Sequence, residues 1–290
     1  MTETYTIAGG DMRFAALAEA LSADGKIVRA LFPCRVPDCR AEIYMNADGI
    51  PPADYLILPV PVTTDGENLN APSLSEPFLL ERLAPLVKRK GCVLGGKMND
   101  KICRIFEERE VYTADYLERE ELTVMNALAT AEGAVMTALQ NQDRMLFGQK
   151  ILIIGMGRIA KALIRNLSGF GADITAAARK PHDLAWAKIW GCKGLDISEL
   201  HGTAGEYTLI FNTVPSLVID EYLLKKLGKD VLIIDLASLP GGTDFSSAER
   251  LGIRTVHALG LPGKTAPVTS GYIIADTIRN IVSERRSLFE

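Results

Sequence analysis

The stretch Ile151-Leu-Ile-Ile-Gly-Met-Gly-Arg-Ile-Ala160 decides the fold of the second half of this chain. Its four leading apolar residues predict a short buried strand, and the glycines that follow predict a turn directly into a helix. Gly155 permits the tight turn, and Gly157 lets the backbone approach a pyrophosphate. Ala160 is small enough for the helix to pack on the strand. The stretch therefore predicts a dinucleotide-binding α/β domain.

The residues that open this helix are candidates to hold the phosphates. Backbone N–H groups of the first turn point out of the positive end of a helix, which places Arg158 and Ile159 beside the pyrophosphate. A solvated surface position is the alternative for Arg158. Leu163 and Leu167 continue the apolar face of the helix, and residues 172–178 predict a second strand. A glycine pair alone is a weak indication of a dinucleotide site, and the helix and second strand that follow it strengthen this prediction.

The end of the second strand predicts which dinucleotide is bound. A site that prefers NAD usually places Asp or Glu there, about 20 residues after the glycines, to bind the ribose 2′-hydroxyl. This chain has Ala176-Ala-Ala-Arg179-Lys180 instead. That sequence has no carboxylate to repel a 2′-phosphate, and Arg179 can form a charge-assisted fork with one. We therefore predict NADP as the cofactor, with Arg179 and Lys180 in its site.

Three later loops are expected at the same edge of the sheet. Buried strands are predicted to end at Asn212, Asp235 and His257, and ligands bind at the carboxyl ends of strands in open α/β sheets. Asp235 has an alternative role, accepting hydrogen bonds from its own loop, and we assign His257 to packing. Lys264, in a glycine–proline loop over 259–267, is a candidate to bind a substrate carboxylate. The cofactor candidates in these loops are Asn212, Thr213, Pro215, Asp235, Ser238, Gly260 and Pro262.

The first half of the chain predicts another α/β domain. A strand runs into Gly9 and Gly10, and a helix with Asp11 as its N-cap follows. Arg13 is either a solvated surface residue or a substrate contact at the carboxyl ends of the strands. Further strands are predicted over 26–32, 55–60 and 92–96.

A loop at the end of the third predicted strand carries two hydroxyl groups, those of Thr63 and Thr64. Loops in this position often form binding sites, so both residues are candidates to bind substrate oxygens. A plain turn is the alternative.

The linker and the C-terminal segment set the expected domain limits. Residues 122–126 look extended, and Thr130 is expected to cap a helix whose first turn contains Glu132. Glu132 either suits the positive helix end or touches ligand in the cleft. A stripe of isoleucines after Thr269 or Ser270 predicts a terminal helix that crosses back to the first domain. We expect an N-terminal α/β domain over 1–122 that contributes to the substrate cleft, an NADP-binding Rossmann domain over 123–265 and the returning helix over 266–290.

Composition limits the class of protein. The chain has 290 residues, 48% of them hydrophobic and 23% charged, and a net charge of −4, which does not favour a nucleic-acid or anionic-membrane surface. No apolar run approaches the ~20 residues that span a bilayer. Five scattered cysteines argue against a disulfide framework and offer no zinc spacing. We therefore expect a cytoplasmic protein with reduced thiols and no metal, and a homo-oligomer.

Several motifs together resemble the family of the A subunit of dipicolinate synthase. They are Gly9-Gly-Asp-Met-Arg13, residues 58–64, 126–133, Gly155-x-Gly-Arg158, 178–179, 211–216, 234–245 and 260–267. The resemblance implies an NADP-linked dehydrogenase that works with a flavoprotein-like B subunit. The reaction it implies is oxidation of a dihydrodipicolinate-level intermediate to dipicolinate, which spore formers make in the mother cell.

Such chemistry removes a hydride and a proton from a dicarboxylate, so the site needs a nicotinamide, a proton acceptor and groups that bind carboxylates. Arg13, Thr63, Thr64, Glu132 and Lys264 are the substrate-binding candidates, and the sequence assigns no catalytic base. Two alternatives remain open. One is a 2-hydroxy-acid dehydrogenase, for which only His257 is loosely placed. The other is an NADP-binding regulatory or scaffolding protein without redox activity of its own.

Overall fold

The computed structural model describes residues 2–287, which divide into two compact units. The first unit contains residues 1–126 and 266–290, and the second contains residues 127–265. The first unit is therefore built from two segments that are distant in sequence.

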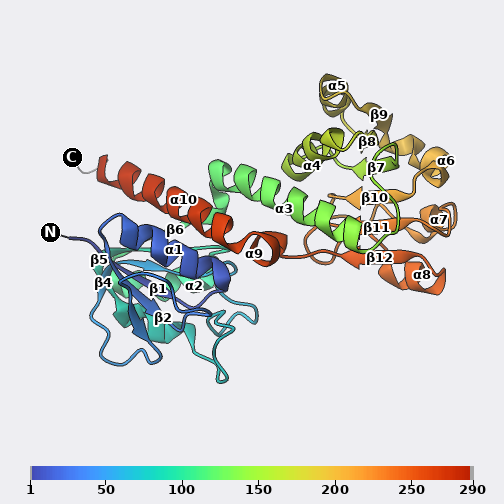
Figure 1. Ribbon diagram of the computed structural model, residues 1–290. Helices are drawn as coiled ribbons and strands as arrows, with labels where there is room; N and C mark the ends of the chain where they lie inside the picture. The colour runs from blue at the N-terminus through green and yellow to red at the C-terminus, as the bar shows by residue number, and fades with distance from the viewer. Residues whose placement is uncertain (1, 288–290) are drawn as a thin grey trace. The chain divides into compact units, whose positions relative to one another are not determined.

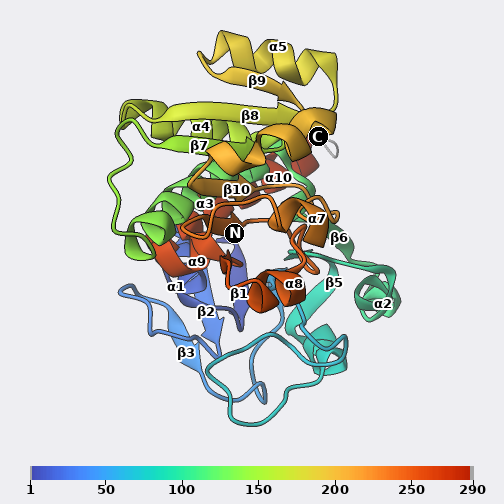
Figure 2. The ribbon, with the colours of Figure 1, turned by 90° about the vertical axis from the view of Figure 1, so that its right-hand side faces the viewer.

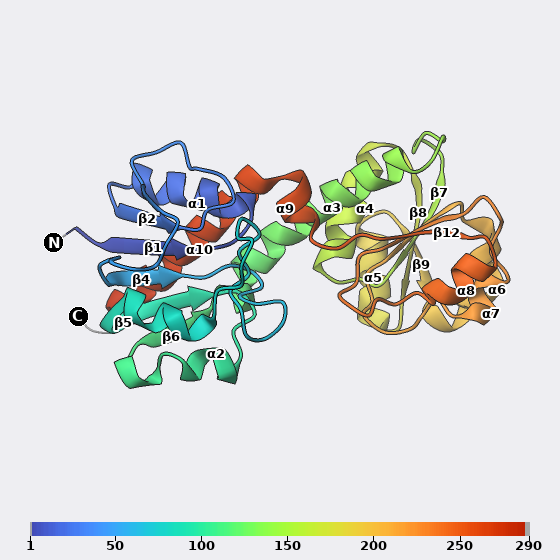
Figure 3. The ribbon, with the colours of Figure 1, turned by 90° about the horizontal axis from the view of Figure 1, so that it is seen from below.

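Each unit contains one six-stranded parallel sheet. Counted in chain order within its unit, each sheet has the strand order 3-2-1-4-5-6, so both are doubly wound Rossmann sheets. Figure 3 shows β2, β1, β4, β5 and β6 of the first sheet in this order, and Figure 2 shows β9, β8, β7 and β10 of the second. The predicted fold class, two α/β domains with the second a Rossmann domain, is confirmed. The strands are β1 (Thr4–Ala8), β2 (Ile27–Leu31), β3 (Glu42–Tyr44), β4 (Ala53–Ile57), β5 (Val87–Gly95) and β6 (Tyr112–Asp115), then β7 (Lys150–Ile154), β8 (Asp173–Ala178), β9 (Lys193–Asp196), β10 (Leu209–Asn212), β11 (Leu232–Asp235) and β12 (Arg254–His257).

Helices cover both faces of the first sheet because its strands are apolar on both sides. Tyr55 and Ile57 point to one face, where they pack with α1 and α10, and Leu56 points to the other. Asp11 caps α1 by accepting a hydrogen bond from the backbone N–H of Arg13, as predicted. The helical elements are α1 (Met12–Ala23), 3₁₀ turns at Leu80–Leu86, Glu107–Arg109 and Tyr116–Glu118, α2 (Asp100–Arg104), the start of α3 (Glu120–Gln140) and α10 (Pro267–Ser287).

The second sheet is buried in the same way. Ile151 and Ile153 pack with α3 and α4 on one face, while Leu152 and Ile154 pack with α6 and α7 on the other. Pro181 occupies the first turn of α5, where its missing N–H costs nothing. The helices are α4 (Arg158–Gly169), α5 (Pro181–Ile189), α6 (Leu200–Thr203) between short 3₁₀ turns, α7 (Glu221–Leu224), α8 (Phe245–Arg250) and α9 (Leu261–Thr265).

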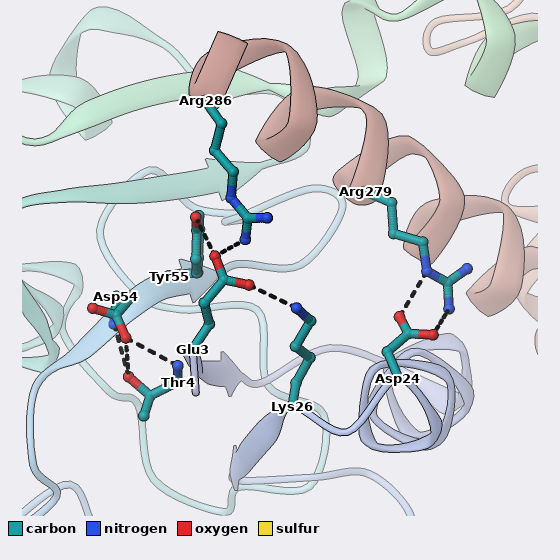
Figure 4. Close-up of polar contacts among 8 residues, drawn as sticks. All are labelled: Glu3, Thr4, Asp24, Lys26, Asp54, Tyr55, Arg279 and Arg286. Carbon is teal, nitrogen blue, oxygen red and sulfur yellow. Dashed lines mark hydrogen bonds and ion pairs between the residues drawn. The ribbon is translucent and has the colours of Figure 1, made fainter. Parts of the chain in front are cut away.

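The terminal helix α10 returns to the first unit, as predicted, and lies alongside α1 (Figure 1). Its isoleucines, including Ile274 and Ile278, are buried in the core of that unit. Ion pairs hold its polar side: Arg279 binds Asp24 after α1, and Arg286 binds Glu3 before β1 (Figure 4).

Three expectations about local structure are wrong. Residues 122–126 are helical, so α3 is continuous from Glu120 and Thr130 lies inside it. The helix extends because Leu122 is buried in the first unit while Ala131 and Ala134 are buried in the second. The terminal helix begins at Pro267, before both predicted caps, and residues 261–265 form α9 where a loop was expected. The short strands β3, β6 and β9 escaped prediction because they carry little apolar alternation.

The helix α3 is long and apolar enough to cross a membrane by length and composition. Half of its most apolar window is buried inside the protein. Ala131, Ala134 and Ala138 on this helix belong to the core of the second unit, so α3 has the character of a core helix.

Candidate dinucleotide-binding site

The turn between β7 and α4 has the geometry that its glycines predict. Gly155 has a φ of +102°, and a Cβ there would lie 2.3 Å from Oγ1 of Thr213. A Cβ on Gly157, the N-cap of α4, would meet open space. Ala160 is fully buried in the core below the turn. The turn therefore needs glycine at 155 for the fold and leaves an open approach to the backbone at 157.

Arg158 and Ile159 open α4 as predicted, with Arg158 exposed and Ile159 partly buried. The N-cap of this helix is Gly157, which has no side chain that could accept a hydrogen bond from the first turn. The positive end of a twelve-residue helix thus faces the open side of the turn.

A cavity of about 500 Å³ lies beside this turn and connects it to the end of β8. Gly155 lines one part of it, and the exposed side chains of Arg179 and Lys180 line another. The cavity therefore joins the phosphate-binding turn to the two cations predicted to select the cofactor. Its other linings are Met156, Ala177, Ala178, Asp183, Ile197, Leu200, His201, Val214, Ser216, Leu217, Val218 and Asp220.

Several of these residues were not predicted from the sequence. His201 lines the cavity from α6, its ring packs 4.9 Å from that of Tyr222, and its Nδ1 is buried without a hydrogen-bond partner among the described residues. Asp183 and Asp220 bring carboxylates, but Asp183 lies 3.3 Å from His182 and Asp220 caps α7. These contributions come from separate elements, and the sequence has no spacing pattern that links them.

Asn212 and Asp235 hold the loops at the ends of β10 and β11. Both residues are fully buried, and Nδ2 of Asn212 donates to Oδ1 of Asp235 over 3.1 Å. The Asp235 carboxylate also accepts hydrogen bonds from the backbone N–H groups of Ala237 and Gly242 and from the hydroxyl of Thr243. With these four hydrogen bonds, Asp235 has the structural role that the sequence analysis gave as an alternative, which is to hold its own loop.

Thr213 links the β10 loop to the glycine turn. Its hydroxyl donates to the backbone carbonyl of Ile154 over 2.8 Å, directly before Gly155. The turn at the end of β7 is therefore tied to the strand that lies next to it in the sheet.

The remaining cofactor candidates do not line the cavity. Pro215, Ser238 and Gly260 are exposed, and Pro262 is buried in α9. His257 has the packing role expected for it: its ring stacks on Phe245, and its Nε2 lies 2.9 Å from the carbonyl of Ala237.

Two substrate candidates of the second unit lie in local structure that differs from the prediction. Glu132 is exposed in the middle of α3, so it does not occupy a first helical turn. Lys264 is exposed on α9, so it does not belong to a loop. The two helices pack closely where Gly133 faces Thr265, because a Cβ on Gly133 would lie 2.9 Å from Oγ1 of Thr265.

The substrate candidates of the first unit lie at the carboxyl ends of β1 and β4. Arg13 is largely buried, is paired with Asp11, and donates from Nη2 to the carbonyl of Val60 over 3.0 Å. The hydroxyl of Thr63 is used inside its own turn, where it donates to Asp65 and accepts from the N–H of Gly66. Thr64 is exposed and lines a separate cavity of about 270 Å³ with Asp65 and Asn68.

The linings of the two cavities contain no cysteine among the described residues. All five cysteines are free, and burial raises the pKa of the Cys92 thiol to about 12. Across residues 2–287, no group of three or more His, Cys, Asp or Glu side chains is arranged to hold a metal ion.

Comparison with known proteins first gives the class. Residues 122–238 match the family model of the D-isomer specific 2-hydroxyacid dehydrogenase, NAD binding domain. With the doubly wound sheet, the glycine turn and the cavity beside it, this match defines a dehydrogenase-type oxidoreductase that binds a nicotinamide dinucleotide.

The particular family follows from the whole chain. Residues 4–117 match the family model of the N-terminal domain of the dipicolinate synthase A subunit. The A subunit of dipicolinate synthase from Bacillus subtilis is 32% identical over 243 residues, which are 82% of each chain. This protein belongs to the dipicolinate synthase A-subunit family, which confirms the resemblance seen in its motifs.

Solved structures agree with this assignment. The crystal structure of the dipicolinate synthase A subunit from Bacillus halodurans matches with a TM-score of 0.86 and 26% identity, over 96% of this chain and 97% of that one. The crystal structure of the corresponding protein from Bacillus subtilis matches with a TM-score of 0.87 and 27% identity, over 99% and 98%.

Proposed function

We propose that this protein oxidises a dihydrodipicolinate-level intermediate to dipicolinate with NADP, acting with the B subunit of dipicolinate synthase in spore formation. Membership of the A-subunit family supports the substrate and the partner. The observation that carries the choice of NADP is the cavity in which Gly155 is joined to Arg179 and Lys180. A guanidinium fork suits a 2′-phosphate, whereas NAD sites usually carry an acid at this point.

The residues proposed for the cofactor have distinct roles. The first turn of α4, from Gly157 to Ile159, binds the pyrophosphate through backbone N–H groups. Arg179 and Lys180 bind the 2′-phosphate. Asn212 and Asp235 act indirectly, because their side chains hold the loops that carry Thr213, Pro215 and Ser238. Gly260 and Pro262, at the start of α9, stay candidates to contact the cofactor.

The proposed substrate is a dianion, so each of its two carboxylates needs a cationic or hydrogen-bond-donating side chain. Arg13, with Thr64 as a further contact, is the carboxylate-binding candidate of the first unit, and Lys264 is the carboxylate-binding candidate of the second unit. Thr63 is not assigned to the substrate, since its hydroxyl is used in its own turn. Glu132 is not assigned either, because a carboxylate repels a dianionic substrate. A nicotinamide held by the cofactor residues would supply the acceptor for the hydride of the dihydropyridine ring. The acceptor of the ring proton is not assigned to a residue; water is one candidate.

The decisive experiment mixes the purified protein with NADP⁺ and enzymatically generated dihydrodipicolinate, with and without the B subunit. We expect NADPH and dipicolinate to form in equal amounts, and we expect a lower Kd for NADP⁺ than for NAD⁺. Failure to form NADPH under both conditions would exclude the dehydrogenase role and leave a regulatory or scaffolding protein. Turnover of simple 2-hydroxy acids instead would indicate a 2-hydroxy-acid dehydrogenase. Equal or tighter binding of NAD⁺ would exclude the NADP assignment.

A further inference from the structure

The first unit has the same strand order as the second, yet its glycine turn differs. Its β1–α1 turn also carries two glycines with positive φ, Gly9 and Gly10, at the point between β1 and β4 where the strand order reverses. In doubly wound sheets this crevice binds ligand. Here the N–H of Gly10 donates to the carbonyl of Asn70 over 2.9 Å, and Asn70 is itself bonded to Pro61 and Val62. A donor that could face a phosphate is therefore already used.

The position of a phosphate at the start of α1 is taken by a side chain of the protein. Oδ1 of Asp11 accepts from the backbone N–H of Arg13 over 3.1 Å, which satisfies one of the free N–H groups in the first turn of α1. Its negative charge at this helix end opposes a phosphate group, which can carry two negative charges on one group. The turn is thus closed to the ligand that the same turn in the second unit is open to bind.

The same carboxylate fixes the guanidinium of Arg13. Nε of Arg13 lies 2.8 Å from Oδ1 of Asp11, and Nη2 lies 2.8 Å from Oδ2. Nη2 also donates to the carbonyl of Val60 over 3.0 Å. The side chain of Arg13 is only 13% exposed, so these bonds hold it in one orientation.

The hydrogen bonds that Arg13 makes to the described residues do not use one nitrogen of its guanidinium, Nη1. Within residues 2–287, the side-chain hydrogen bonds of Arg13 use Nε or Nη2. The two N–H groups of Nη1 are the remaining donors of the guanidinium. They belong to a side chain that is fixed between Asp11, at the start of α1, and the carbonyl of Val60, after β4, so a ligand carboxylate that accepts from them needs no reordering of the side chain.

We propose that this crevice is selective for a carboxylate over a phosphate and that Asp11 is the residue that sets this selectivity. Asp11 acts as a positioning residue: it orients Nη1 of Arg13 toward a ligand carboxylate and repels the greater charge of a phosphate. The Asp11–Arg13 pair is neutral as a whole, so it accepts a single carboxylate group, with one negative charge, more readily than a doubly charged phosphate group. The identity of the ligand as a pyridine dicarboxylate rests on the proposed function, whereas the carboxylate selectivity does not.

The test is calorimetric titration of the full chain with pyridine-2,6-dicarboxylate, the monocarboxylate pyridine-2-carboxylate and inorganic phosphate. The variants are D11S, which keeps a helix cap but removes the charge, R13K, which removes the fork, and the D11S/R13K double variant. D244S is the matched control, because Asp244 caps α8 without an arginine two residues later. Only binding that R13K weakens is counted for this crevice, which separates it from anions bound in the second unit.

We expect the wild type to bind at least one carboxylate in an Arg13-dependent manner and phosphate at least tenfold more weakly. D11S should weaken carboxylate binding about tenfold and gain phosphate binding that the double variant loses, while D244S binds as wild type does. Carboxylate affinity of D11S within twofold of wild type would overturn the proposal, as would Arg13-dependent phosphate binding of equal strength in the wild type or no Arg13-dependent carboxylate binding.

The outcome is separable from that of the proposed function. Arg13-dependent binding of pyridine-2-carboxylate without binding of pyridine-2,6-dicarboxylate would support the selectivity and exclude the proposed substrate. NADP-linked oxidation of dihydrodipicolinate with unchanged KM and kcat in D11S would support the proposed function and overturn the role of Asp11. Thermal unfolding of every variant reports whether the first unit is folded.

Discussion

Nδ2 of Asn212 donates a hydrogen bond to Oδ1 of Asp235 over 3.1 Å, and it joins the ends of two neighbouring strands, β10 and β11. Both side chains are fully buried. The bond stabilises the loops at the carboxyl edge of the second sheet, the edge where the glycine turn also lies. These loops are therefore fixed by the protein itself rather than by a ligand.

Replacing Asp235 with Ala should destabilise the second unit by at least about 3 kcal/mol, because several buried donors lose their acceptor and each unpaired group costs about 1–3 kcal/mol. Urea unfolding followed by circular dichroism measures the change. The S238A variant is the control, since Ser238 is exposed three residues later in the same loop. A loss below about 1 kcal/mol in D235A would contradict the structural role.

The two glycines of the β7–α4 turn should respond differently to Ala. G155A should lower stability by about 2 kcal/mol, because a left-handed backbone costs a non-glycine residue about 1–2 kcal/mol and the new Cβ would approach Thr213. G157A should fold normally, since its Cβ meets open space, but weaken NADP⁺ binding about tenfold or more, which is about 1.4 kcal/mol. Denaturant unfolding and calorimetry separate the two effects. Unchanged cofactor affinity in G157A would argue against a pyrophosphate at this turn.

Arg179 is expected to distinguish the two nicotinamide dinucleotides. A hydrogen bond to a charged group contributes about 1.5–3 kcal/mol, so R179A should raise the Kd for NADP⁺ roughly 30-fold and leave the Kd for NAD⁺ nearly unchanged. K188A is the control, because Lys188 is an exposed lysine at the other end of α5. Parallel weakening of both dinucleotides in R179A would show that the arginine does not read the 2′-phosphate.

The ion pair between Arg279 and Asp24 should contribute modestly to the docking of α10 (Figure 4). Nε of Arg279 lies 2.8 Å from Oδ2, and Nη2 lies 3.1 Å from Oδ1. Because both side chains are about one-third exposed, we expect R279A to cost about 0.5–1 kcal/mol, and less in 1 M salt. K225A serves as the comparison, because it removes the exposed ion pair between Glu221 at the start of α7 and Lys225 directly after it, in the second unit. A loss that salt does not reduce would point to packing by the arginine stem instead.

Asp54 should make the first unit more stable above pH 4 than below it. Partial burial alone would raise the pKa of Asp54, but hydrogen bonds from Lys88 and Thr4 outweigh burial, so this pKa lies below its ordinary value of 3.8. The carboxylate bonds to Thr4 appear in Figure 4.

A group whose pKa is depressed in the folded state stabilises the protein above its unfolded pKa, and the contribution is lost as pH falls through the folded value. D54N should therefore lower the melting temperature at pH 7 and approach wild type at pH 2–3. An equal difference between the two proteins at both pH values would exclude the linkage.

The sequence predicted those features that depend on neighbours along the chain. The glycine turn follows from Gly155 because only a residue without a Cβ adopts its backbone conformation beside Thr213. Asp11 was predicted as a helix cap because capping needs only the next two or three residues. The α10 stripe was predicted from its isoleucines, whose period matches a helix.

The features that escaped prediction depend on partners distant in sequence. The continuity of α3 could not be read from residues 122–126, because it depends on burial of Leu122 in one core and of Ala131 in another. Likewise, α9 forms where Leu261 packs into the same hydrophobic core as Ile151 and Ile153 of β7.

By itself, the sequence determined the fold class, the dinucleotide turn and the family, because each is encoded in short motifs with a local backbone requirement. Only the tertiary structure decided that Asp235 is saturated by its own loop, that His201 lines the cavity beside Arg179, and that Asp11 locks Arg13 in place. These outcomes depend on the position of strand ends in a parallel sheet. Side chains separated by many residues become neighbours there, and their free or used hydrogen-bonding groups decide which ligand can enter.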